Sequence, residues 1–365
     1  GTGPFAIWSP DGKFVLFPGF RATDPKISDW WVAPVDGAPA VATGASRSII
    51  RPTTVVYPMG WFRNQIIFGK GTTVEGFNLY STDINTRTWQ VSEAPKPLTS
   101  GPGTQAEPSV SEDGRMVFSS SKMQLSIFSL PLDPVRGTAA GEPEKITQDE
   151  MVKTQPEISR DGSKLVYGAY GRVSSGTMEV RMKDMVSGRE TTAAKTSPSF
   201  VFFPKISADG SKIAYGDLVE GKWRSFLVAG ETSGSRPICD NCVIRCFCAN
   251  SRDAIVQHGN ELVRRNLADG SQTPVLKIGA GSIQDACLSA DDRWLAFQIS
   301  KPSGGYAIYA APVSGKAALE KEWILIADES TYQQSPRWSK DGNIIYFISE
   351  RDGSSCIWAQ RLNPS

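Results

Sequence analysis

The chain has 365 residues, and its 39 lysine and arginine residues nearly balance its 38 aspartate and glutamate residues, so the formal net charge is +1. This balance gives no sign of the strongly basic surface that binds nucleic acid or anionic membranes, and we expect neither partner. No segment approaches the roughly 18 consecutive apolar residues that a membrane-spanning helix needs, so we expect no membrane span. The N-terminus has no signal peptide, and Gly1-Thr2-Gly3 resembles a trimmed end, which leaves the compartment open.

A short phrase recurs along the chain: Ser, any residue, Asp, Gly, then an apolar run rich in Val, Ile, Phe and Tyr. Copies stand at residues 9–12 (SPDG), 111–114 (SEDG), 159–162 (SRDG), 207–210 (SADG), 289–292 (SADD) and 339–342 (SKDG). Asp-Gly between apolar runs predicts a hairpin, because Gly accepts a positive φ and Asp bonds nearby backbone N–H groups. Each apolar run is a predicted strand, and we expect three or four antiparallel strands per copy.

The turn aspartates define the period of this repeat. Asp113, Asp161 and Asp209 follow one another at intervals of 48 residues, whereas 102 residues separate Asp11 from Asp113 and 82 separate Asp209 from Asp291. Each long gap is about twice the period, so each is expected to contain one decayed copy. These copies are residues 61–64 (WFRN), where Asn64 is expected to replace the glycine in the left-handed conformation, and residues 249–252 (ANSR).

Eight copies of about 40–50 residues, each with four strands, match the blades of a propeller. The sequence therefore predicts one all-β domain over residues 1–365, an eight-bladed β-propeller with four-stranded antiparallel blades; seven or six blades are the alternatives. The predicted blades span residues 1–50, 51–100, 101–150, 151–198, 199–240, 241–280, 281–330 and 331–365. Only residues 363–365 follow the last predicted strand, so either the N-terminal residues complete the last blade or it has three strands.

Four copies belong to a longer phrase that begins with Pro, at residues 108–118, 156–167, 204–215 and 336–347. This phrase resembles the WD40-like Asp-Gly repeat of TolB-type β-propellers, and the resemblance covers nearly the whole chain. Residues 237–242 (PICDNC) and 349–362 (SERDGSSCIWAQRL) look similar to the propeller regions of acidobacterial-type proteins. The resemblance implies a propeller that binds peptides, proteins or ligands, fused to a kinase or a winged-helix DNA-binding domain outside this chain.

The cysteines are the strongest local anomaly in the sequence. Cys239, Cys242, Cys246 and Cys248 fall within ten residues, and Cys287 and Cys356 lie elsewhere. Four thiolates can hold zinc, but zinc ribbons usually join two separated pairs, whereas both pairs here share one short loop and strand. We predict a Cys239–Cys242 disulfide and no metal or cofactor, with inert buried thiols or a zinc site as the alternatives. The abundance of cysteine favours a periplasmic or extracellular compartment; the cytoplasm is the alternative.

Little in the sequence points to catalysis. His258 is the single histidine, so Ser-His-Asp or Cys-His chemistry depends on that residue, and no Gly-x-Ser-x-Gly elbow is present. The turn aspartates recur at one structural position and are expected to form turns. One alternative is a propeller-fold lyase or glycoside hydrolase in which Glu107 and Asp285 face each other across the channel. A purely structural interaction domain is the other.

The position four residues before each repeat Ser is expected to lie where the innermost strand starts, near one mouth of the central channel. Its residues vary from aromatic to acidic to basic: Phe5, Tyr57, Glu107, Gln155, Phe203, Arg245, Asp285 and Ser335. One interpretation is that these side chains only pack between blades. The other, which we favour as the function, is a polar and aromatic funnel that binds a peptide, a protein segment or a small polar ligand without catalysis.

Overall fold

The structure is a computed structural model. It describes the chain except for residues 1–5, 22–23, 51–54, 73–75, 93, 102, 123, 134, 150, 171–177, 197–201, 221, 231–233, 330–332 and 363–365. Over the described residues, 33 strands accompany one short helix, α1 (Ala45–Ser48), and one 3₁₀ turn (Glu320–Glu322). The described strands form two compact units, one within residues 1–124 and one within residues 125–365.

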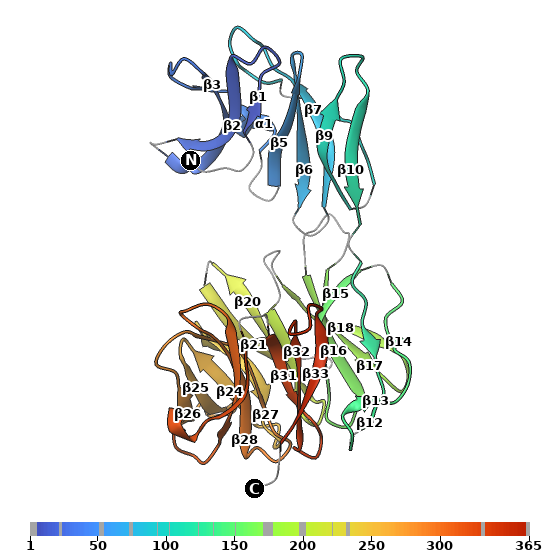
Figure 1. The fold of residues 1–365 in the computed structure, drawn as a ribbon, viewed down its shortest axis with the longest axis vertical. Helices are drawn as coiled ribbons and strands as arrows, with labels where there is room; N and C mark the ends of the chain where they lie inside the picture. Colours follow the sequence, from blue (N-terminus) through green and yellow to red (C-terminus); the bar gives the residue numbers. More distant parts are fainter. Residues whose placement is uncertain are drawn as a thin grey trace. The chain divides into compact units, whose positions relative to one another are not determined.

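The first unit contains two four-stranded sheets and a hairpin, all antiparallel and with their strands in chain order (Figure 1). The first sheet is β1 (Ile7–Trp8), β2 (Phe14–Arg21), β3 (Asp24–Pro34) and β4 (Val41–Ala42). The second is β5 (Val55–Phe62), β6 (Gln65–Thr72), β7 (Gly76–Asp83) and β8 (Lys96–Pro97), and the hairpin is β9 (Thr104–Val110) and β10 (Met116–Ser121).

The second unit begins with short pairs: β11 (Phe128–Ser129) with β14 (Glu144–Lys145), and β12 (Leu132–Asp133) with β13 (Thr138–Ala139). Two four-stranded sheets follow: β15 (Val152–Ile158), β16 (Lys164–Tyr170), β17 (Met178–Asp184) and β18 (Glu190–Thr196), then β19 (Phe202–Ile206), β20 (Lys212–Val219), β21 (Lys222–Ala229) and β22 (Arg236–Asp240). The next two are β23 (Val243–Phe247), β24 (Asp253–His258), β25 (Glu261–Asn266) and β26 (Gln272–Lys277), then β27 (Ser282–Leu288), β28 (Trp294–Ser300), β29 (Tyr306–Pro312) and β30 (Ile324–Glu329). The last sheet has three strands, β31 (Gln333–Trp338), β32 (Ile344–Ser349) and β33 (Cys356–Arg361).

These sheets follow the predicted repeats closely. Each predicted blade range contains one sheet, except that the third is divided into β9–β10, β11–β14 and β12–β13. The boundary between the two units also lies in this third repeat, between residues 124 and 125. The all-β class with four-stranded antiparallel blades is confirmed, whereas a single eight-bladed ring stays a prediction.

The repeated turn is held by one set of hydrogen bonds. Ser207 Oγ donates to Asp209 Oδ1 (2.6 Å), which also accepts the Ser211 backbone N–H (3.0 Å), and Ser207 Oγ accepts the Lys212 N–H (2.9 Å). Gly210 has a φ of 68°, in the left-handed region that glycine adopts without steric cost, which explains why the turn sequence has glycine here. The same bonds recur in the turns at residues 9–14, 159–164, 289–294 and 339–344.

The two decayed copies differ in detail from the prediction. In the second repeat Phe62 pairs with Gln65 in a tight hairpin, and the left-handed residue is Arg63 (φ 52°), not Asn64. In the sixth repeat the Cys248 N–H donates to Asp253 O, as Ser159 N–H does to Lys164 O in the fourth. This turn therefore begins at residue 248, one position earlier than the predicted 249, because Ser251 (φ 53°) replaces the glycine.

The hydrophobic core lies between neighbouring sheets. One cluster joins Ile255 and Leu262 of the sixth repeat to Leu295 and Phe297 of the seventh. Comparable clusters join the fourth repeat to the fifth, the fifth to the sixth and the seventh to the eighth. In the first unit, Leu16 and Trp30 pack against Ile66 and Phe68. Face-to-face packing of successive sheets is how radial repeats bury their apolar surface.

A β-bulge interrupts the innermost strands. Glu107, Gln155, Phe203 and Ser335 have φ between 54° and 57°, and each precedes a proline. In β19, for example, the pairing with β20 shifts between Phe202 and Lys205. Proline has no backbone N–H to donate, and it is tolerated at a bulge because the bulged segment lacks a ladder hydrogen bond there. The bulge re-aims the residues that follow it, and those residues build the site described next.

Candidate functional site: a basic central pocket

The innermost strands of the second unit surround one pocket of about 490 Å³. Strands β15, β19, β23, β27 and β31 all contribute to it, together with the turns that follow them, and each of these strands contacts the next in the series. The volume lies within the roughly 300–1,000 Å³ typical of small-molecule sites. The pocket is therefore a central feature of this unit and not a groove on its outer edge.

One register position supplies the inward-facing residue of all five strands. It lies two residues before the first residue of each turn and holds Glu157, Lys205, Cys246, Cys287 and Arg337. A uniform scaffold position would carry one residue type. The mixture of a carboxylate, two cations and two thiols at equivalent places shows that these repeats differ chemically at this position.

Ion pairs connect these strands across the pocket. Lys205 Nζ lies 2.7 Å from Glu157 Oε2, and only 4% of the Lys205 side chain is exposed. Arg337 Nη1 donates to Asp285 Oδ2 (2.9 Å), and Arg337 Nη2 lies 4.0 Å from Glu157 Oε2. Burial alone would raise the pKa of Asp285, but Arg337 and Lys205 bring it below its usual value. The same carboxylates raise the pKa of Arg337 against the opposing effect of its burial.

Arg245 is a second deeply buried cation beside the pocket, with 5% of the residue exposed. Its Nε donates to Gln257 Oε1 (2.6 Å) and its Nη2 to Ile283 O (3.2 Å), while its guanidinium carbon lies 5.4 Å from the centre of the Phe203 ring. Burial lowers the pKa of Arg245, although Asp285 opposes this effect. Nη1 has no hydrogen-bond partner among the described residues.

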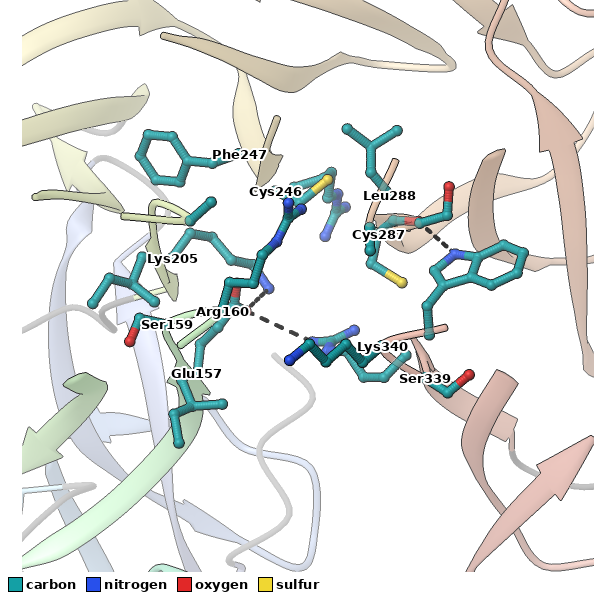
Figure 2. A pocket seen from close by; sticks show the side chains of 18 of the residues that line it. Glu157, Ser159, Arg160, Lys205, Cys246, Phe247, Cys287, Leu288, Ser339 and Lys340 are labelled. Carbon is teal, nitrogen blue, oxygen red and sulfur yellow. Dashed lines mark hydrogen bonds and ion pairs between the residues drawn. The ribbon is translucent and has the colours of Figure 1, made fainter. Parts of the chain in front are cut away.

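The pocket has two chemically distinct walls. We call Cys246, Phe247, Cys287, Leu288 and Trp338 the apolar wall, and Glu157, Arg160, Lys205, Arg337 and Lys340 the charged wall. Figure 2 shows Phe247, Cys246, Leu288 and Cys287 along one side, with Glu157, Arg160 and Lys340 opposite. With Arg245, five basic side chains and one carboxylate line the pocket. Such a concave surface has a positive potential.

The structure distributes the eight predicted channel residues over both units. Phe5 lies outside the described residues, and Tyr57 and Glu107 belong to the first unit, where Glu107 is exposed and the Tyr57 ring lies 6.0 Å from that of Phe77. The other five lie within β15, β19, β23, β27 and β31. They are residues Gln155, Phe203, Arg245, Asp285 and Ser335, of which Arg245 alone is among the residues lining the pocket.

Gln155, Phe203 and Asp285 instead hold the strands and side chains that form the pocket. The Phe203 backbone N–H donates to Gln155 Oε1 (2.7 Å), which links two neighbouring strands. Asp285, 6% exposed, holds Arg337. Sequence reasoning missed Glu157, Lys205, Cys287 and Arg337 because it placed the variable position at the strand start. Counting back two residues from each turn, and not four, finds them.

The cysteines lie in two separate clusters. Cys239 and Cys242 are joined by a disulfide, with their Cα atoms 5.9 Å apart, and both pack in the cluster between the fifth and sixth repeats. Cys246 and Cys248 pack on the other side, between the sixth and seventh repeats. The four sulfur atoms therefore do not converge on one point, as a tetrahedral zinc site would require. Within the described residues no other group of His, Cys, Asp and Glu side chains is suited to hold a metal ion.

His258 has no catalytic neighbours in the described part of the chain. It ends β24 opposite Glu261, and burial followed by the nearby Arg265 lowers its pKa. Its Nε2 atom is buried and without a hydrogen-bond partner among the described residues. The residue is not among those lining the pocket, so nothing in this geometry assigns it to the site.

Comparison with solved structures identifies the architecture. TolB from Acinetobacter baumannii is 11% identical and superposes with a TM-score of 0.53, over 85% of this chain and 77% of that one. The protein has the fold of a TolB-type β-propeller. No protein-family model matches the chain, and no curated protein does. The described residues include no helix long and apolar enough to cross a bilayer.

Two further structures superpose on the chain with lower TM-scores. A TolB from Agrobacterium tumefaciens is 19% identical over 60% of this chain and 81% of its own, with a TM-score of 0.47. Oligogalacturonate lyase from Vibrio parahaemolyticus is 13% identical over 96% of this chain and 97% of its own, also with a TM-score of 0.47. At these similarities neither structure informs the chemistry of the pocket.

Proposed function

We propose that this TolB-type propeller is a non-enzymatic binding or sensing domain whose ligand occupies the central pocket of the second unit. The ligand is a peptide, a segment of a protein or a small polar molecule. The observation that carries this proposal is the convergence of a carboxylate, two cations and two thiols, all at one register position, on a cavity of ligand size. Asp285 is committed to Arg337, and the aspartates of the repeat are committed to turns, so the chain's own chemistry favours binding over acid–base catalysis.

A thermal-shift screen of short peptides and small polar molecules tests this proposal. Arg160 and Lys340 are exposed residues at the pocket. Arg160→Ala and Lys340→Ala should therefore lower the affinity for a ligand found in the screen while leaving the fold intact. Arg293→Ala is the matched control, because Arg293 is an exposed turn residue that does not line the pocket. A ligand that binds both pocket variants as tightly as it binds the unchanged protein would contradict the site.

We also propose that the domain works outside the cytoplasm, joined to a kinase or winged-helix domain for which it acts as the sensor. The Cys239–Cys242 disulfide supports an oxidising compartment, since such bonds are rare where thiols are kept reduced. The resemblance of residues 237–242 and 349–362 to propeller regions of such fusions supports the second part. Fractionation of cells that express the full-length protein tests the compartment.

A further inference from the structure

Arg337 is held at one edge and open at the other. Its Nη1 atom donates to Asp285 Oδ2 (2.9 Å) and to Pro336 O (2.8 Å), which fixes the plane of the guanidinium group. Its Nη2 atom is 4.0 Å from Glu157 Oε2, beyond hydrogen-bond length, and 40% of the side chain is exposed. A fixed guanidinium plane with a free edge is a geometry that receives a planar oxyanion.

The other cations of the pocket also attract an anion, and they leave the free edge of Arg337 open to it. Lys205 is almost fully buried and bonded to Glu157, so it acts through its charge and not as an exposed donor. Arg160 and Lys340 are exposed at the pocket. Because Glu157 is the single carboxylate that lines the cavity, an incoming anion meets a net positive potential.

The apolar wall has few free polar groups. Trp338 Nε1 donates to Cys287 O (3.2 Å), and the Cys287 thiol donates to Pro336 O (2.8 Å), so both polar atoms are already satisfied within the protein. Phe247 and Leu288 add only hydrocarbon to this side. A ligand group placed against this wall gains by burying apolar surface and not by hydrogen bonding.

Together the two walls define the chemical class of the ligand. We propose that the central pocket recognises a free carboxylate attached to an apolar body, with Arg337 binding the carboxylate and the apolar wall packing against the body. This inference rests on the proposed function and makes it more specific. Two sources share this chemistry: the C-terminus of a peptide that ends in an apolar residue, and a small free acid.

Titration calorimetry with matched probes tests the carboxylate. N-acetylphenylalanine should bind at least about tenfold more tightly than N-acetylphenylalanine amide, since a charged hydrogen bond contributes about 1.5–3 kcal/mol. It should also bind about tenfold more tightly than N-acetylglycine, which lacks the apolar body. Equal affinity for the acid and the amide, or for the phenylalanine and glycine derivatives, would overturn the proposal. A tripeptide ending in Phe and phenylpropanoate separate the two sources, because the tighter of the two identifies the natural class.

Substitutions then assign the contact to Arg337. Arg337→Gln should abolish the preference for the acid over the amide, whereas Arg293→Gln should keep it. Because Arg337→Gln leaves Asp285 without its cation, the double variant Asp285→Asn with Arg337→Gln removes both charges and should also lose the preference. A double variant that folds and keeps the preference refutes the role of Arg337. If the screen instead finds a neutral ligand that depends on Arg160 and Lys340, the proposed function stands and this inference fails.

Discussion

At the scale of single residues, the repeated aspartate and the cysteines owe their behaviour to their surroundings. Partial burial alone would raise the pKa of Asp209. The hydrogen bonds that Asp209 accepts from Ser207 and Ser211 outweigh this effect and lower the pKa well below its usual value. The carboxylate is therefore part of the turn, as the sequence indicates. For Cys287 burial dominates, and it raises the pKa of this thiol to about 12.

Replacing the turn aspartate should reduce stability and leave binding unchanged. Asp209→Ala removes the acceptor of the Ser207 and Ser211 bonds and should lower the free energy of unfolding by about 1 kcal/mol. Asp209→Asn keeps a side-chain oxygen that can accept these bonds, so it should lower the free energy of unfolding by less. Urea denaturation measures both variants. An Asp209→Ala variant with unchanged stability and impaired ligand binding would show that the residue belongs to a site and not to the scaffold.

The four unpaired cysteines should differ widely in reactivity. Cys356 is exposed, whereas burial raises the pKa of Cys248 and Cys287 to about 12 and that of Cys246 well above its usual value. Since the thiolate is the reactive form, iodoacetamide at pH 8 should label Cys356 first in the native protein. In denaturant without reductant the other three should also react, while the Cys239–Cys242 bridge stays unlabelled. Mass spectrometry checks each position, and free thiols at 239 and 242 would exclude the bridge.

At the scale of strands and turns, the sequence predicts the repeats well and the site poorly. Ser-x-Asp-Gly determines each hairpin through local hydrogen bonds, so the turns and the strands after them are readable without tertiary information. The bulges are not readable in this way, because which residue leaves the ladder depends on pairing with the next strand. A shift of one residue reverses the side-chain direction. That is why Gln155 and Phe203 were predicted to line the channel, whereas Glu157 and Lys205 line the pocket.

The Asp285–Arg337 pair should join β27 to β31 energetically. Asp285 is almost fully buried, so Arg337→Gln removes the cation that is hydrogen-bonded to this carboxylate and should cost at least about 2 kcal/mol. The exposed edge of Arg337 and the remaining charge of Lys205 keep this below the roughly 3–5 kcal/mol typical of fully buried pairs. Asp285→Asn should cost a similar amount. The double variant should lose less than the two single losses together, because neither charge is then left alone. Strictly additive losses in urea denaturation would show that the pair does not couple the strands.

At the scale of the whole molecule, the eight repeats share the recurring turn sequence of a propeller, five pairs of neighbouring repeats share a buried core among the described residues, and the period predicts a single ring. Closure would protect the outer sheets, since an open series leaves strand edges free to pair with other chains. The second unit already brings its first and last innermost strands together through Glu157 and Arg337. Whether the first unit joins this arrangement decides between one domain of 365 residues and two bodies.

Small-angle X-ray scattering of the monomer distinguishes these two arrangements. One closed domain of 365 residues should have a radius of gyration of about 21 Å, the value expected for a compact domain of this length, and a pair-distance distribution with one maximum. Two separately moving units would give a larger radius and a shoulder at long distances, because mass then lies in two centres. The Arg293→Ala variant serves as the control, since an exposed turn substitution should leave the curve unchanged. A radius several ångströms above the compact value would reject the single eight-bladed ring, while leaving the pocket of the second unit untouched.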